Sequence, residues 1–214
     1  MGGLSAPAAA RLGVLGGTFD PPHRMHLALA RAAMDQLRLT RVLFVPAGDP
    51  WRKAGARVSP AADRLAMTRL AVAAEPDFAG SDMELRRAGP TYTRDTLAAL
   101  RAQASAAAGP PALWFIVGSD ALADLPNWRE PERIIALARL AVAARPGAEL
   151  DPAALDAIVP GLSARVDWLA LDADALSATV LRGRIAGGEP VGDDADAAVV
   201  EYARRRGLYA ESDP

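Results

Sequence analysis

Short apolar segments alternate with longer segments of helical spacing along most of this chain, and that alternation restricts the fold more than any other feature. Four runs of aliphatic and aromatic residues have the length and composition of strands buried on both faces: residues 12–15, 42–45, 113–117 and 140–143. Because parallel strands are joined by crossover connections that are usually helices, the pattern predicts an α/β fold. We expect a doubly wound parallel sheet with helices on both faces.

Weaker patterns fill in the remaining elements. Residues 82–85 and 166–171 are two less regular strand candidates. Ser59 and Pro60 form a good N-cap and first-turn pair for one helix. Further helices are predicted over residues 27–37, 93–101, 132–137 and 180–185. In a Rossmann-like sheet of this kind, right-handed crossovers place ligands outside the carboxyl ends of the strands.

The composition is that of an ordinary globular chain. Its 214 residues predict a single domain over residues 1–214, with a small C-terminal helical part from about residue 177. It contains no cysteine, which excludes disulfides, thiolate nucleophiles and cysteine zinc sites. The net charge of -2, with neither a secretory signal pattern nor a run of ~20 apolar residues, predicts a cytoplasmic protein that binds neither nucleic acid nor membrane. Homo-oligomerisation stays open.

The turn after the first predicted strand carries the strongest chemical signal. Residues 16–26 read GGTFDPPHRMH, and a helical pattern follows them. Glycines at a strand-to-helix turn let the backbone approach a ligand closely, and the helix N-terminus offers unpaired N–H groups to an anion. The spacing is not that of the G-x-G-x-x-G motif, and no acidic residue ends the second strand. A dinucleotide fold of the NAD type is therefore poorly supported.

The two histidines of the chain, His23 and His26, are three residues apart at this helix start, so their rings can share one face. For an arbitrary pair, capping or surface histidines are the more frequent outcome. A zinc site would need carboxylates as its remaining ligands, because there is no cysteine and no further histidine, and we predict no metal site. Two imidazoles beside a glycine turn instead suit a polyphosphate whose charge grows in a transition state.

Two further groups have the chemistry of phosphate ligands. Lys53 is the only lysine in the chain, and its compact, mobile ammonium suits a phosphate charge that moves during a reaction; a solvated loop residue is the alternative. Ser177 can cap the helix predicted over residues 180–185. With Thr179 and Arg182 it would form a second helix-end site, for β- and γ-phosphates. Ordinary capping and a surface arginine are the alternative there.

Three residues later in the chain are candidates for contacts to a sugar or a ring. Gly118 and Asp120 follow a predicted strand at its carboxyl end, where an acceptor could take hydrogens from a ribose or a base. Helix capping explains Asp120 equally well. Trp128 follows a Pro-Asn turn, so its ring could be exposed for stacking on a pyridine, and a core tryptophan is the competing interpretation.

These residues belong to an ordered set of motifs. GGTFDPPHRMH resembles the signature of the nucleotidyltransferases that share a mononucleotide-binding fold with class I aminoacyl-tRNA synthetases. Further blocks resemble those of bacterial nicotinate-mononucleotide adenylyltransferases over roughly residues 12–209: PWRK, GPTYT, FIVGSD, LPNW, RPG and SATVLR, in this order. The chain departs from that family at Met25, where the family usually has a glycine close to the adenine ring. Met25 either narrows the base pocket or turns into the helix packing.

The resemblance implies an enzyme that transfers AMP from ATP to nicotinate mononucleotide, giving deamido-NAD and pyrophosphate, with Mg²⁺ on the ATP. It implies that His23, His26, Lys53 and Arg182 act in catalysis. Contacts to ATP would come from Gly16, Gly17, Thr18, Phe19, Gly118, Asp120, Ser177 and Thr179. Contacts to nicotinate mononucleotide would come from Tyr92, Thr93, Trp128 and Arg145. The alternatives are a related nucleotidyltransferase that uses another phosphate acceptor or CTP, and a non-catalytic nucleotide sensor.

Overall fold

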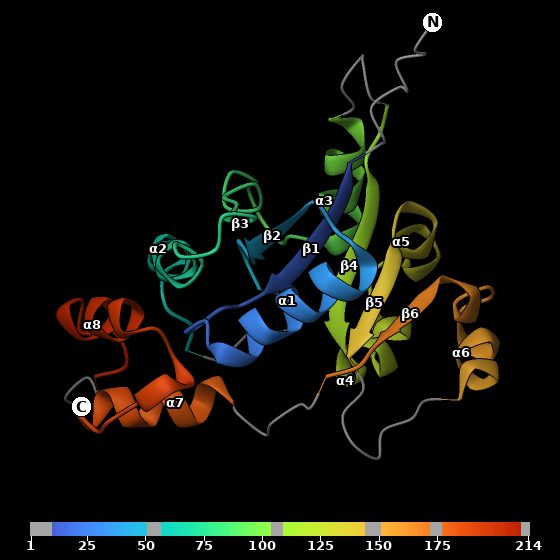
Figure 1. Cartoon of the computed structure of the whole chain (residues 1–214). Coiled ribbons are helices and arrows are strands. Elements are labelled where there is room, and N and C mark those ends of the chain that lie inside the picture. Colours follow the sequence, from blue (N-terminus) through green and yellow to red (C-terminus); the bar gives the residue numbers. More distant parts are fainter. Residues whose placement is uncertain (1–9, 51–56, 104–108, 144–150, 172–176, 211–214) are drawn as a thin grey trace, which may run out of the picture.

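The strands form one parallel sheet in the computed structural model, which describes residues 10–50, 57–103, 109–143, 151–171 and 177–210 (Figure 1). Within these residues the strand order is β3-β2-β1-β4-β5-β6. All neighbouring pairs are parallel. The strands are β1 (Arg11–Gly17), β2 (Arg41–Pro46), β3 (Phe78–Gly80), β4 (Ala112–Gly118), β5 (Arg139–Ala143) and β6 (Val166–Leu169). This is the order of a doubly wound Rossmann sheet, and its direction of winding reverses between β1 and β4.

The four strands predicted from continuous apolar runs are confirmed as β1, β2, β4 and β5. The weaker candidate at residues 166–171 is confirmed as β6, although this strand ends at Leu169. The candidate at residues 82–85 is wrong, because the strand beside β2 is Phe78–Gly80 and residues 83–86 form a turn. Ser81 ends that pairing by donating its N–H to the Phe44 carbonyl (2.9 Å), before the chain turns away from the sheet.

Helices cover both faces of the sheet, as predicted for a doubly wound fold. They are α1 (Arg24–Leu37), α2 (Ala61–Ala71), α3 (Thr93–Ala102), α4 (Ser119–Ala123), α5 (Pro131–Leu137), α6 (Pro152–Ile158), α7 (Ala178–Ala186) and α8 (Ala197–Arg205). Three short 3-10 segments are η2 (Leu125–Asn127), η3 (Ser163–Arg165) and η4 (Gly192–Asp194). In the described residues no helix is both long and apolar enough to cross a membrane.

The caps of two helices test the capping predictions. Ser177 is the N-cap of α7, and its hydroxyl accepts the Val180 N–H (3.4 Å), as predicted. The prediction for α2 is off by one residue, because Pro60 and not Ser59 is the N-cap. Ser59 has other partners: its N–H donates to Asp20 Oδ2 (2.9 Å), and its carbonyl accepts from Arg64 Nε (2.9 Å).

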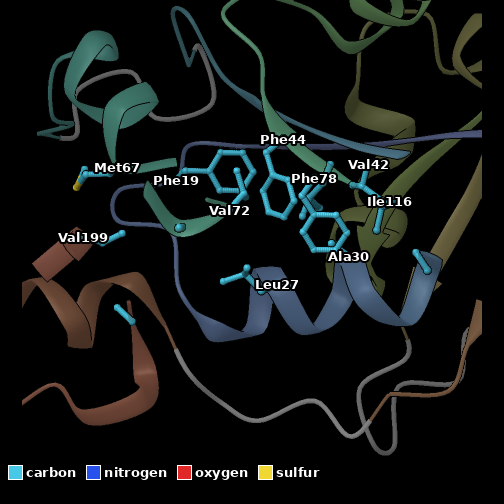
Figure 2. Close-up of a cluster of buried hydrophobic side chains, with 14 of the residues drawn as sticks. Phe19, Leu27, Ala30, Val42, Phe44, Met67, Val72, Phe78, Ile116 and Val199 are labelled. Carbon is cyan, nitrogen blue, oxygen red and sulfur yellow. The ribbon is translucent and has the colours of Figure 1, made fainter. Parts of the chain in front are cut away.

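Each face of the sheet has its own hydrophobic cluster. On one face α1, α2, α7 and α8 pack against a row of phenylalanines, in which Phe44 lies 5.7 Å from Phe19 and 5.5 Å from Phe78 between ring centroids (Figure 2). On the other face α3 to α6 pack against Phe115 and its neighbours in β4 and β5. The two clusters hold the carboxyl ends of β1 and β4 between packed layers, and these ends form the floor of the site.

Candidate active site

A cavity of about 420 Å³ opens at the carboxyl ends of β1, β2 and β4, where the winding of the sheet reverses. Ligands of doubly wound sheets bind at this position, and the volume suits a small-molecule site. One wall is the turn after β1 with the start of α1, and the other is the start of α3 with the segment after α4. The residues of these walls that were predicted as ligands are Gly16, Gly17, Thr18, His26, Tyr92, Thr93, Gly118 and Trp128.

The glycines allow the turn after β1 to approach its neighbours. A Cβ on Gly17 would lie 3.1 Å from the Phe19 ring, and one on Gly16 would lie 3.4 Å from the Phe115 ring. Phe19 has a left-handed backbone (φ 51°), which is uncommon for a large residue, and its buried ring packs edge-on against His26 with 5.0 Å between centroids. The ring of Phe19 therefore supports His26 from the core, and its contact to ATP stays a prediction.

The two histidines lie together at the start of α1, where His23 is the N-cap and His26 is the third helical residue. Their ring centroids are 3.8 Å apart, so the prediction that the rings share one face is confirmed. The backbone N–H of His23 donates to His26 Nδ1 (3.1 Å). Because Nδ1 accepts this hydrogen bond, the neutral His26 ring carries its proton on Nε2, which can donate to an oxygen.

His23 is held in its neutral form. Its side chain is buried, and this burial lowers its pKa from 6.5 to about 4. The nearby Asp194 carboxylate opposes the shift and Arg24 adds to it. Its Nδ1 is buried without a hydrogen-bond partner among the described residues, which is uncommon and leaves one polar atom of this turn able to accept a partner.

Aromatic side chains build the opposite wall. Trp128 packs edge-on against Phe115 (5.7 Å between centroids) and donates from Nε1 to Asp124 Oδ2 (3.1 Å). The guanidinium of Arg129 lies 4.9 Å from the centre of the Tyr92 ring. Thr91 is buried on the same wall, and its hydroxyl has no hydrogen-bond partner in the described residues. This wall therefore offers flat apolar surface with a buried polar atom, which suits a planar ring with a polar substituent.

A second cavity, of about 470 Å³, lies beside the turn on the side of α7. Arg182 and Arg57 line it, together with Asp20. Arg182 donates from Nη2 to the Thr179 hydroxyl (3.0 Å) and from Nη1 to the backbone carbonyl of Asp20 (2.9 Å). Arg182 is thus hydrogen-bonded both to Thr179 and to the turn, and the role of Ser177, Thr179 and Arg182 as phosphate ligands stays a prediction.

Some predicted ligands lie away from these cavities. Of the residues that the structure describes, the lining of the two cavities includes none of Phe19, His23, Ser177 and Thr179. Asp120 is exposed in the first turn of α4 and does not line the cavity that its neighbour Gly118 lines. Lys53 and Arg145 lie outside the described residues. Within the described ranges no cluster of three histidines, carboxylates or cysteines could hold a metal ion.

Arg64 organises the site and was not predicted. It is 1% exposed, and its guanidinium donates to the carbonyls of Thr18 (3.0 Å), Ala47 (2.7 Å), Gly48 (3.2 Å) and Ser59 (2.9 Å). It therefore ties the turns after β1 and β2 to the start of α2. Its signal in the sequence is a cation at helical spacing from Thr68 and Ala71, both on the buried face of α2.

Comparison with known proteins gives matches over most of the chain. Residues 14–184 match a family model described as Cytidylyltransferase-like. A relative from Roseiflexus sp. (strain RS-1) is 46% identical over 202 residues, which covers 94% of this chain and 99% of the relative. One from Chromobacterium violaceum is 45% identical over 214 residues, with the same two coverages. Both are named "Probable nicotinate-nucleotide adenylyltransferase".

Solved structures with the same fold exist at low identity. The structure titled "Plasmodium falciparum nicotinic acid mononucleotide adenylyltransferase complexed with NaAD" superimposes with a TM-score of 0.75. It is 16% identical and covers 94% of this chain and 97% of that chain. The likeness at this identity concerns the fold.

Proposed function

Because the chain belongs to the cytidylyltransferase-like family, together with close relatives named as nicotinate-nucleotide adenylyltransferases, we propose that it transfers AMP from ATP to nicotinate mononucleotide. The products are deamido-NAD and pyrophosphate, and the reaction belongs to NAD biosynthesis. One observation carries the proposal: a single cavity joins the glycine turn and His26 on one side to Tyr92, Thr93 and Trp128 on the other. A nucleotide and a pyridine ring can therefore meet over the ends of β1 and β4.

The reaction needs no nucleophile from the protein. A phosphate oxygen of nicotinate mononucleotide attacks the α-phosphorus of ATP, a new P–O bond forms, and the bond to the bridging oxygen breaks with its electron pair leaving on pyrophosphate. The attacking phosphate is already ionised, so the chain contributes position and charge stabilisation. His26, with its proton on Nε2, would donate to an α-phosphate or bridging oxygen where charge grows.

His23 and the turn would share that task. Gly16, Gly17 and Thr18 line the cavity and can bring backbone groups close to the nucleotide. His23 is neutral in the structure, because burial lowers its pKa. A bound polyphosphate would raise that pKa again, so His23 can gain a proton as negative charge accumulates beside it.

The leaving pyrophosphate would lie toward the second cavity. Arg182 lines this cavity and is held by two hydrogen bonds, and Arg57 lines it as a second cation. Ser177 and Thr179 would contribute through the N-terminus of α7. Lys53 would follow the transferred phosphoryl group; its segment precedes Arg57 in the chain. Because the described residues contain no cluster of carboxylates or histidines for a metal, Mg²⁺ would be bound together with ATP, mostly through phosphate oxygens and water, and would offset the charge of the phosphates.

The pyridine end of the acceptor would lie against the aromatic wall. Trp128 would stack on the ring, and its indole is already oriented by Phe115 and Asp124. Tyr92 and Thr93 would hold the nicotinate carboxylate at the start of α3, where helix N–H groups favour an anion. The buried hydroxyl of Thr91 would gain a partner there. Arg145 would face the mononucleotide phosphate.

The test is a product assay with four substrate pairs. Purified protein with MgATP or MgCTP is given nicotinate mononucleotide or nicotinamide mononucleotide, and dinucleotide and pyrophosphate are measured separately. We expect equimolar deamido-NAD and pyrophosphate from ATP and nicotinate mononucleotide, and a large loss in His26→Ala. Turnover of another acceptor, or of CTP in preference to ATP, would assign the chain to a different reaction. Nucleotide binding without any turnover would favour a sensor.

A further inference from the structure

The last described residues of the chain reach back to the turn after β1. The Tyr209 hydroxyl donates to Asp20 Oδ1 (2.8 Å), across 189 residues of sequence. The other oxygen of this buried carboxylate accepts the Ser59 N–H (2.9 Å). The backbone carbonyl of Asp20 accepts from Arg182 (2.9 Å). Asp20 is thus held from three directions, and two of the donors lie in the C-terminal helical part.

Tyr209 is built to remain a donor. Burial, together with the adjacent Asp20 carboxylate, raises the pKa of its phenol far above the ordinary range, so the hydroxyl keeps its proton throughout the physiological range. Its backbone is left-handed (φ 73°), which is rare for an aromatic residue. The surrounding fold, and not the backbone preference of a tyrosine, therefore sets the position of the Tyr209 side chain.

Asp20 is directly connected to the histidines. It follows Phe19, whose ring supports His26, and only Pro21 and Pro22 separate it from His23. Residues 19–23 are all buried. Proline rings fix φ, so this short segment has few torsions with which to absorb a displacement. A shift of the Asp20 carboxylate is therefore passed on to the start of α1, where both imidazoles lie.

We propose that Tyr209 is a positioning residue for AMP transfer: through Asp20 its hydroxyl sets the place of His23 and His26 beside the reacting phosphorus. This rests on the proposed function. Tyr209 does not line the cavity between the glycine turn and Trp128. It lines the second cavity, where the pyrophosphate would lie, so a double-mutant cycle with Asp20 is needed to separate a direct contact to pyrophosphate from the route through Asp20. Its removal should impair the chemical step more than substrate binding, because a small misplacement of catalytic groups lowers the rate with little effect on the ground state.

The chain offers a matched control. The Tyr202 hydroxyl also donates to a buried carboxylate at 2.8 Å, that of Asp63 in α2, which lies outside the turn and both cavities. Tyr209→Phe and Tyr202→Phe each remove the hydroxyl of one tyrosine of the C-terminal part, and with it one hydrogen bond to a buried aspartate. A purely structural role for Tyr209 predicts that the two variants behave alike: a lower melting temperature with wild-type kcat.

The experiment measures kcat and both KM values for the wild type and the two variants, at least 15 °C below each melting temperature. We expect Tyr209→Phe to lower kcat about tenfold with each KM changed less than threefold, and Tyr202→Phe to keep kcat within twofold. Equal kcat in all three proteins overturns the inference, as does a Tyr209→Phe effect confined to KM. A wild type that makes no deamido-NAD would instead refute the proposed function.

A double-mutant cycle with Asp20→Asn gives a second, independent measurement. If Tyr209 acts through Asp20, the two changes share one effect, and the double variant should lose clearly less kcat than the product of the two single losses. Strictly multiplicative losses would place Tyr209 on a separate route and overturn the inference. Circular dichroism of each variant at the assay temperature establishes that folded enzymes are compared.

Discussion

The protein should lose stability in weak acid, because His23 takes up a proton in the unfolded chain at a pH at which it stays neutral in the folded chain. The folded chain holds this imidazole neutral with a pKa of about 4, against 6.5 in the unfolded chain. Its contribution to stability is therefore complete above pH 6.5, and it is lost as the pH falls toward 4, because only the unfolded chain binds the proton in that window. From these two pKa values, the loss between pH 7.5 and pH 5 is about 2 kcal/mol of unfolding free energy.

The variant His23→Asn isolates this effect. Asparagine is favoured at the N-cap position, so α1 should tolerate it there while the titrating ring is removed. Urea unfolding at pH 7.5 and pH 5 should show a loss in the variant that is smaller than the wild-type loss by about 2 kcal/mol. Acidic groups titrate in both proteins and cancel in this comparison. Equal losses in the two proteins would show that His23 is not held neutral by the fold.

Four further substitutions have defined outcomes. His26→Ala should lower kcat by about 10²–10³-fold, with a smaller change in the KM for ATP, as steady-state kinetics would show; an active variant would remove its catalytic role. Lys53→Arg should reduce kcat in the same assay without a change in melting temperature, because a planar fork replaces a mobile ammonium; wild-type turnover would make Lys53 a solvated loop residue. Arg64→Met should cost at least about 2–3 kcal/mol in urea unfolding, since a buried carbonyl that loses its donor costs about 1–3 kcal/mol; a loss under 1 kcal/mol would contradict the network. Met25 is half-buried in α1, and it is not among the described residues that line the first cavity. Met25→Gly should therefore lower the free energy of unfolding by about 0.5–1 kcal/mol and leave the ATP-to-CTP ratio of kcat/KM unchanged. A higher ratio in the variant would show that the thioether covers the base.

The strands that are buried on both faces could be predicted, because they are continuous runs of apolar residues. β1, β2, β4 and β5 are covered by helices on both faces, so every position favours an apolar side chain and the strands are continuous runs. β3 escaped prediction because it is an edge strand of three residues that includes Ala79 and Gly80. At Gly80 a Cβ would lie 2.9 Å from the Arg69 side chain. Close packing at this edge selects a small residue, and a small residue carries no strand signal.

The candidate site could be predicted where its residues are neighbours in sequence. Gly16, Gly17, His23 and His26 lie within eleven consecutive residues, and the two rings meet because His23 is the N-cap of α1 and His26 is its third residue. Tyr92 and Trp128 could be assigned to one cavity only through the family resemblance, because their meeting depends on how two separate crossovers pack. Nothing in the local pattern of either residue specifies the other.

Arg64 and Tyr209 could not be predicted, for a more general reason. Each acts on a partner far away in sequence, 46 residues from Arg64 to Thr18 and 189 from Tyr209 to Asp20. The partner of Arg64 is a set of backbone carbonyls, which every residue type possesses. A pattern in the sequence can show where a donor is, but not which carbonyl it serves. Residues that position a site are therefore harder to predict than residues that touch its ligand.

The C-terminal helical part, which the sequence predicts from about residue 177, makes several contacts to the turn after β1 and the start of α1. Asp194 in η4 accepts from Arg24 at the start of α1 (2.8 Å) and from Arg184 in α7 (2.9 Å), and its charge acts on His23. Arg182 and Tyr209 hold Asp20 from the same side. Residues of the C-terminal helical part therefore contact both the turn after β1 and the start of α1, where the two histidines lie. Because the proposed AMP transfer depends on the position of both histidines, we expect loosening of α7 and α8 to lower turnover before it unfolds the sheet.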